Sequence, residues 1–167
     1  VVVSTSGIVP KIYELAKDIN INLALSLHAC NDKLRSDLMP IARRYSLDDL
    51  KNNLIFFQQE RKQTITLEYI LIKDVNSSLE HARELVKFAK SVRSKVNLIP
   101  FNAHPGLPYE RPSESTIMTF QRYLKKHNVP SPIRYSKGLD ISAACGQLAA
   151  KVSEDFHQTP QRINVVK

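Results

Sequence analysis

The sequence predicts an α/β fold built on a parallel β-sheet. Short runs of apolar, β-branched residues alternate along the chain with segments in which apolar residues recur at helical spacing. Such alternation is typical of parallel strands joined by right-handed helical crossovers. The predicted strands are apolar along most of their length, which is typical of strands covered on both faces. A β/α barrel and an open, doubly wound sheet both fit this pattern.

Five segments are predicted as strands, because each is short and mostly apolar. In chain order they are residues 1–4 (VVVS), 22–27 (NLALSL), 64–72 (TITLEYILI), 95–100 (KVNLIP) and 132–136 (PIRYS). The third of these segments has the strongest strand pattern.

One helix is predicted after each strand. The helices cover residues 10–19, 46–57, 76–90, 115–127 and 140–152. Ser46 and Asp49 have capping-box spacing at the start of the second helix, and Ser77 and Glu80 have the same spacing in the third. The apolar residues of each segment fall on one helical face, so we expect these helices to pack against the sheet.

The composition is typical of one globular domain, with 167 residues of which 43% are hydrophobic. No apolar run approaches the ~18 residues of a membrane span, and the opening residues do not resemble a signal peptide. The sequence begins without Met in a strand-like run, so we expect the natural N-terminus to lie upstream. The only two cysteines, Cys30 and Cys145, form no CxxC motif, and free thiols favour a cytoplasmic location.

The chain is basic, with a formal net charge of +8 at pH 7. Lys and Arg recur along the whole length rather than in one run. A solvated basic surface explains this distribution, and so does a nucleic-acid partner whose phosphates need positive charge. Both interpretations remain open at this point, and no zinc-finger or RGG motif decides between them.

Polar residues follow three of the predicted strands. Ser4 follows the first apolar run, Ser26 and His28 flank Leu27 at the end of the second strand, and Asn102 follows the fourth. In parallel α/β folds the binding site lies at this carboxyl edge. Each residue alone also has a structural explanation: a helix cap, a buried histidine or a turn. Together, their hydroxyl, imidazole and amide groups suit a nucleotide-like cofactor.

Cys145 lies in a run of small residues, DISAACGQLAA (140–150). If this run is helical, Ile141, Cys145 and Leu148 share one face, and Cys145 is a small core residue. Gly146 argues for a different interpretation, because glycine weakens a helix and permits close approach of another molecule. Composition leaves the two alternatives open.

Five blocks in the same order resemble the RlmN/Cfr family of radical-SAM RNA methyltransferases, with RlmN the more similar branch. The blocks are STSGIVP, LALSLHA, LEYILIKDVNSS followed by HA, NLIPFNAHPG, and GLDISAACGQLA preceded by Arg134. They extend over nearly the whole chain and resemble the C-terminal half of these enzymes. The resemblance implies a partial, incomplete β/α barrel of the radical-SAM type, which agrees with the strand–helix alternation.

The same resemblance implies the site and its chemistry. S-adenosylmethionine would contact Ser4, the segment Ser26, Leu27 and His28, and Asn102. Cys145 would carry a methyl group as S-methylcysteine. A 4Fe–4S cluster would cleave a second S-adenosylmethionine to a radical that activates this methyl group for addition to position 2 of an adenine. The substrate would be ribosomal RNA, and in the RlmN branch also transfer RNA.

Several family features have no counterpart in residues 1–167. The missing features are the CxxxCxxC cluster motif, the upstream cysteine that would resolve the protein–RNA adduct, the GEP-containing cofactor segment and the accessory RNA-binding region. We therefore expect the chain alone to be inactive. Cys30 matches no family motif, and we predict it to be a packing residue. A non-catalytic remnant that binds RNA or a protein partner is the alternative. A barrel enzyme acting on a phosphate-bearing substrate fits the five blocks poorly.

Overall fold

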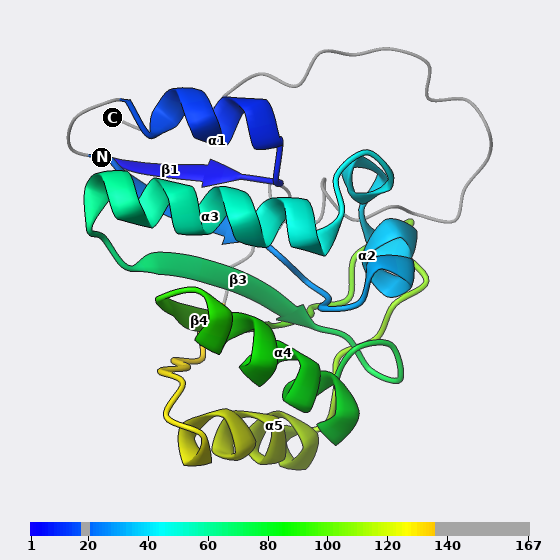
Figure 1. Ribbon diagram of the computed structural model, residues 1–167. Coiled ribbons are helices and arrows are strands. Elements are labelled where there is room, and N and C mark those ends of the chain that lie inside the picture. The colour runs from blue at the N-terminus through cyan, green and yellow to red at the C-terminus, as the bar shows by residue number, and fades with distance from the viewer. Residues whose placement is uncertain (18–20, 136–167) are drawn as a thin grey trace.

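The computed structural model describes residues 1–17 and 21–135, which form an α/β fold around one parallel sheet (Figure 1). The sheet has four strands in the order β1-β2-β3-β4. All three pairings between neighbours are parallel. The strands are β1 (Val2–Thr5), β2 (Asn22–Ser26), β3 (Ile65–Leu71) and β4 (Ser94–Pro100).

The strand order distinguishes the two architectures that the sequence left open. The strands follow one another without reversal, whereas a doubly wound sheet reverses its order at a switch point. The main helices also share one face of the sheet, the near face in Figure 1. They are α1 (Val9–Leu15), α3 (Leu47–Arg61), α4 (Leu79–Ser91) and α5 (Glu114–Lys126). The described residues therefore form part of a β/α barrel, as predicted.

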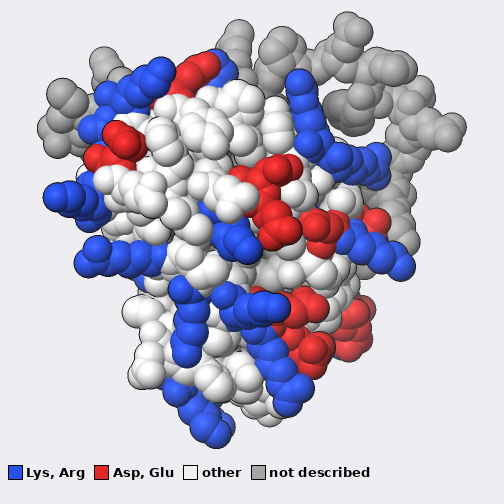
Figure 2. Space-filling model, viewed as in Figure 1, with Lys and Arg blue, Asp and Glu red and all other residues white. Residues whose placement is uncertain are grey.

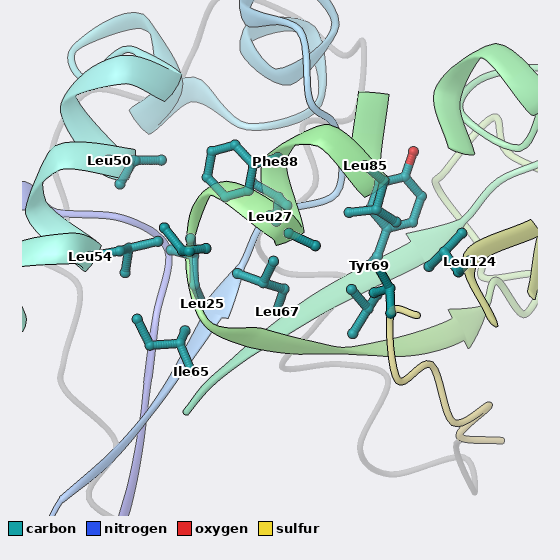
Figure 3. Packing of buried hydrophobic residues seen from close by; sticks show 14 of the residues in the cluster. Leu25, Leu27, Leu50, Leu54, Ile65, Leu67, Tyr69, Leu85, Phe88 and Leu124 are labelled. Carbon is teal, nitrogen blue, oxygen red and sulfur yellow. The ribbon is translucent and has the colours of Figure 1, made fainter. Parts of the chain in front are cut away.

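The main hydrophobic core lies between these helices and the sheet (Figure 3). Leu25 and Leu67 are partners in the β2–β3 register, so their side chains project to the same side. Leu54 of α3, Leu85 of α4 and Leu124 of α5 meet this face of the sheet. Burial of these aliphatic side chains is the principal stabilising contribution to the fold.

The opposite face of the sheet is more polar. The register aligns Ser4, Ala24, Thr66 and Lys95 in one row. A second, smaller cluster covers this side nearer the carboxyl edge; it contains Ala29, Leu38, Met39, Ala42, Ile70, Ile72 and Phe101. The segments α2 (Asp32–Leu38) and η1 (Pro40–Arg43) contribute to this cluster.

Most of the predicted elements are confirmed, with shifts at their ends. Helix α3 begins after a capping box formed by Ser46 and Asp49, as expected. In contrast, α4 is capped by Ser78, which accepts a hydrogen bond from the N–H of His81, so the prediction of Ser77 as the cap was wrong. The short helices α2 and η1 were not predicted. The helix predicted at 140–152 lies outside the described residues.

The fifth predicted strand, at 132–136, is largely wrong as a regular strand. Its described part forms a single parallel bridge between Ile133 and Leu98. The carbonyls of Pro130 and Pro132 accept from β4, and the N–H of Arg134 donates to Leu98. Proline has no N–H to donate, so this segment can form only part of a regular ladder.

Charge is distributed over the helix-covered face rather than gathered into one patch. In Figure 2, Lys and Arg side chains spread across the visible face with acidic groups between them. Within the part of the chain that the structure describes, no helix is long and apolar enough to cross a membrane. This view of the surface gives no single basic groove that would by itself identify a nucleic-acid partner.

Candidate functional site

The sequence-predicted residues lie at one edge of the sheet. Since the strands are parallel, β2 ends at Ser26 and β4 ends at Pro100 on the same carboxyl edge. His28 and Asn102 directly follow these ends, and Ser4 lies in β1 beside its own carboxyl end. The structure therefore brings these polar residues to one edge.

Ser4 and Ser26 project from the polar face of the sheet. Ser4 pairs with Ala24, and side chains on one strand return to the same face every second residue. Ser4 is exposed, whereas Ser26 is only 4% exposed. Of these two hydroxyls, Ser4 is the one directly open to solvent.

Leu27 points in the opposite direction, into the main hydrophobic core. Its backbone N–H donates to the carbonyl of Glu68 at 2.9 Å. Its carbonyl accepts from Nε of Arg35 at 3.1 Å. The same carbonyl also accepts from the N–H of Ala29 at 2.8 Å, so the backbone groups of Leu27 are already engaged within the protein.

His28 is a buried and neutral side chain that continues the pairing of β2 with β3. Its Nδ1 accepts from the N–H of Ile70 at 3.1 Å, and its backbone adopts a left-handed conformation with φ of 60°. Burial, with a smaller contribution from the charge of Arg35, lowers the pKa of His28 to about 3. Because Nδ1 accepts, the ring proton is assigned to Nε2, which has no hydrogen-bond partner among the described residues.

Asn76 holds the turn beyond β3 against His28. Its Nδ2 donates to the carbonyls of His28 at 2.8 Å and Ile70 at 2.7 Å, and its Oδ1 accepts from the N–H of Ile72 at 2.8 Å. The hydroxyl of Tyr69 donates to the Asn76 carbonyl at 2.8 Å. Because Asn76 is fully buried, these bonds fix the edge rigidly.

Arg35 is a buried guanidinium that joins the carboxyl ends of β1 and β2. Its Nη2 donates to the carbonyls of Ser6 at 2.9 Å and Ser26 at 3.2 Å, in addition to the bond from Nε to Leu27. Burial lowers the pKa of Arg35 to about 10, so the group stays charged at neutral pH. Gly7 adopts φ of +102°, and a Cβ there would lie 3.1 Å from Nη2, so glycine allows this close approach.

Sequence reasoning missed both Arg35 and Asn76. Asn76 lies in the family-like block LEYILIKDVNSS, but the sequence pattern placed it in the predicted helix at 76–90. Arg35 lies in α2, a helix of seven residues for which the periodic pattern was too short to detect. Asn31 carried a usable signal, because its side chain caps α2 by accepting from the N–H of Leu34 at 2.8 Å.

Asn102 is held by the loop that follows β4. Nη1 of Arg111 donates to Oδ1 of Asn102 at 3.2 Å, and Nη2 of Arg111 donates to Glu114 at 2.6 Å. The same guanidinium lies 5.7 Å from the ring centroid of Tyr135, at the end of the described chain. Arg111 thus orients the Asn102 amide at the edge where His28 also lies.

Of the two cysteines, the structure describes only Cys30. Cys30 is half-buried against the main core, and burial raises the pKa of its thiol far above the ordinary value. This agrees with its prediction as a packing residue. Cys145 lies outside the described residues. Residues 1–17 and 21–135 contain no group of three or more His, Cys, Asp or Glu side chains that could hold a metal ion.

The polar side chains at this edge fit S-adenosylmethionine but not the 4Fe–4S cluster, the two cofactors that the family resemblance implies. The hydroxyl of Ser4, Nε2 of His28 and the amide of Asn102 are neutral groups that suit the ribose, adenine and amino-acid parts of S-adenosylmethionine. The unpartnered buried donor on His28 is the structural observation that favours such a ligand. A 4Fe–4S cluster does not fit, because it is held by several cysteine thiolates and this chain has two distant cysteines.

The sequence has well-defined relatives, although no protein-family model matches it. It is 45% identical to the dual-specificity RNA methyltransferase RlmN of Alcanivorax borkumensis, over 96% of this chain and 46% of that protein. It is 47% identical to the RlmN of Syntrophus aciditrophicus, over 93% of this chain and 44% of that protein. The chain therefore spans about half the length of the curated relatives it matches.

Comparison with solved structures indicates the same class of protein. A radical SAM methyltransferase from Sphaerobacter thermophilus matches with a TM-score of 0.81 and 45% identity, over 90% of this chain and 44% of that chain. A domain of pyruvate-formate lyase-activating enzyme from Bacteroides vulgatus matches in fold, with a TM-score of 0.64, 14% identity and 80% coverage of both chains. The fold and the similarities define part of a radical-SAM methyltransferase barrel. Within that class, the chain corresponds to an RlmN-like part of such an enzyme.

Proposed function

We propose that the chain forms part of an enzyme that methylates an adenosine base carbon, position 2, in ribosomal RNA and in some transfer RNAs. The identity of 45–47% with RlmN proteins over more than nine-tenths of the chain is the observation that supports this most strongly. The net charge of +8 suits an RNA substrate. A reducing cytoplasm is the compartment that fits such a substrate and the free thiols.

In this proposal the carboxyl edge of the sheet binds S-adenosylmethionine, which supplies the methyl group. Ser4 and Asn102 contribute a hydroxyl and an oriented amide, and His28 contributes the unpartnered Nε2–H. Ser26 and Leu27 complete the proposed set, Ser26 through its hydroxyl on the same edge and Leu27 through its position between Ser26 and His28. The neutrality of His28 is useful here, because a charged imidazole would repel the cationic sulfonium of the cofactor.

Cys145 is the proposed methyl carrier. Its thiolate sulfur would bond to the methyl carbon of S-adenosylmethionine as the methyl–sulfonium bond breaks and S-adenosylhomocysteine leaves. The methyl group would then be held as S-methylcysteine before transfer to the adenine carbon. The radical chemistry needs a cluster whose ligands this chain lacks, so residues 1–167 alone would be inactive. We therefore assign cluster binding and the accessory RNA contacts to other parts of an enzyme of this family, whose members are about twice as long.

Substitution of Cys145 tests this proposal in the complete gene product, produced together with iron–sulfur assembly proteins. Cys145→Ala should abolish methylation of ribosomal RNA and leave the melting temperature unchanged, because only one sulfur is removed. Mass spectrometry should find a methyl group on the peptide that contains Cys145 in the wild type. Cys30→Ala is the matched control and should retain activity. Full activity in the Cys145 variant would exclude it as the carrier.

A non-catalytic RNA-binding remnant is the second candidate, and the net charge of +8 favours it. This candidate predicts RNA binding without methyl transfer by any form of the gene product. RNA affinity should then fall steeply between ~50 and 200 mM salt, as phosphate contacts require. Methylation by the complete gene product would rule out the remnant.

A further inference from the structure

Three polar side chains form a second row across the face of the sheet opposite the main core. Ser26 of β2 pairs with Glu68 of β3, and Glu68 pairs with Asn97 of β4. Paired residues in a parallel sheet project to the same side, and neighbouring strands lie about 4.8 Å apart. We refer to Ser26, Glu68 and Asn97 as the polar row.

The polar row occupies a part of the sheet where strands covered on both faces usually carry apolar residues. Ser26 and Asn97 are 4% and 7% exposed, and Glu68 is partly buried. No hydrogen bond joins any of the three side chains to another described residue. None of their polar atoms is among the fully enclosed atoms without a partner, so these atoms remain open to solvent. Polar groups that are mostly surrounded by protein but still reach solvent can pair with a ligand that displaces the water.

The chemistry of the row indicates which ligand it suits. Burial raises the pKa of the Glu68 carboxyl, and the charge of Arg134 acts in the opposite direction. A carboxyl and an amide on neighbouring strands, which lie about 4.8 Å apart, can converge on one base edge, where Glu68 accepts from an amino group and Asn97 pairs with a ring nitrogen. A phosphate would be repelled by an ionised Glu68, so a neutral base fits better.

We propose that Glu68 and Asn97 bind the amino edge of an adenine ring, beside Ser26 on the polar face of the sheet. The preference for adenine over cytosine rests on the proposed function, because both bases carry an amino group. The ring could belong to S-adenosylmethionine or to an adenosine of the RNA. These two sources present the same donor and acceptor groups, and binding measurements separate them.

The experiment is a double-mutant cycle between protein and ligand, measured by calorimetry on the complete gene product. The probes are S-adenosylmethionine and a short single-stranded RNA with one adenosine, each compared with its purine analogue that lacks the amino group. Glu68→Ala should weaken the adenine form of one probe about tenfold, the expected effect of one lost base contact. It should leave the corresponding analogue unaffected. Asn97→Ala should weaken both forms of that probe, since the ring nitrogen is retained.

Two controls separate this effect from loss of folding. Glu60→Gln changes an exposed carboxyl on α3 and should leave all four affinities unchanged. Circular dichroism should show an intact fold in every variant. A Glu68 effect on S-adenosylmethionine alone assigns the row to the cofactor, and an effect on RNA alone assigns it to the substrate base.

The inference is overturned if Glu68→Ala weakens the adenine form and its analogue equally, or behaves like the Glu60 control. It is also overturned if the wild type binds neither probe. None of these outcomes depends on methyl transfer. A gene product that binds adenine through the row but never methylates RNA would therefore contradict the proposed function and leave the inference intact.

Discussion

The two faces of the sheet differ in chemistry although the same four strands form both. The helix-covered face carries buried aliphatic residues such as Leu25 and Leu67. The opposite face and the carboxyl edge carry polar groups, including Glu68 and His28, that are only partly satisfied by the protein. Within one strand, neighbouring residues therefore serve different purposes: one stabilises the fold and the next is available for ligand chemistry. Substitutions on the helix-covered face should change stability alone, and those at the edge should also change ligand affinity.

The largest expected effect comes from the helix-covered face. Phe57 of α3 is fully buried in the main core. Phe57→Ala should lower the free energy of unfolding by about 3–5 kcal/mol, because it removes apolar burial and leaves a cavity. Urea unfolding followed by circular dichroism measures this loss.

Phe56 is the matched control, since it is the adjacent aromatic residue and is only half-buried. Phe56→Ala should cost less than half as much. Equal losses at the two positions would show that the helix-covered face is not the principal source of stability.

The next effect tests the edge. Arg35→Met keeps most of the side-chain volume but removes a donor from the carbonyls of Ser6, Ser26 and Leu27, of which Leu27 still accepts from the N–H of Ala29. We expect a loss of about 2–4 kcal/mol in the free energy of unfolding, since a buried group without a partner costs ~1–3 kcal/mol. Unlike the Phe57 variant, this variant should also weaken S-adenosylmethionine binding at temperatures where it remains folded.

Arg35→Lys separates charge from geometry, because an ammonium group cannot reproduce the planar fork of the guanidinium. It should recover only part of the lost stability. If the lysine variant matched the wild type in stability and cofactor affinity, the geometry of the three carbonyl contacts would be irrelevant.

A third effect depends on pH and arises at His28. The imidazole has a pKa of about 3 in the folded state and 6.5 in the unfolded chain. Between these values the unfolded state binds more protons, so acid favours unfolding. The contribution of His28 to stability is complete above pH 6.5 and is lost as pH falls toward 3. The slope is about 1.4 kcal/mol per pH unit, or ~2 kcal/mol at pH 5.

Urea unfolding between pH 4 and pH 7.5 measures this slope. Glu68 acts with the opposite sign, because its pKa is raised in the folded state, so acid stabilises the fold through this group. His28→Gln provides the control, since glutamine does not titrate and its oxygen can still accept from the N–H of Ile70. The difference between the two profiles isolates His28, and parallel profiles would contradict the assignment of a buried neutral imidazole.

The helix-covered face could be predicted from the sequence because periodicity records burial directly. Ile117, Phe120 and Leu124 have helical spacing and all three are buried in α5. The parallel strands followed from the same reasoning. The segment at 132–136 failed because its apolar residues resemble a strand, while its prolines cannot complete the ladder.

The edge was only partly predictable. Position after a strand identified His28 and Asn102, because parallel strands end together. Position could not show that Arg111 orients Asn102 or that Arg35 joins two strands, since these contacts connect residues distant in sequence. The polar row depends on strand register, which no single strand encodes.

The smallest expected effect concerns the start of α4, where two adjacent serines allow a matched comparison. Ser78 accepts from the N–H of His81, whereas sequence spacing had favoured Ser77 as the cap. Ser78→Ala should lower the free energy of unfolding by about 1 kcal/mol, because a helix donor loses its partner. Ser77→Ala should cost clearly less in the same urea titration. Neither variant should alter ligand affinity, since a cap acts on the helix and not on the polar face. A larger loss of unfolding free energy for Ser77→Ala than for Ser78→Ala would instead support the capping box that the sequence predicts.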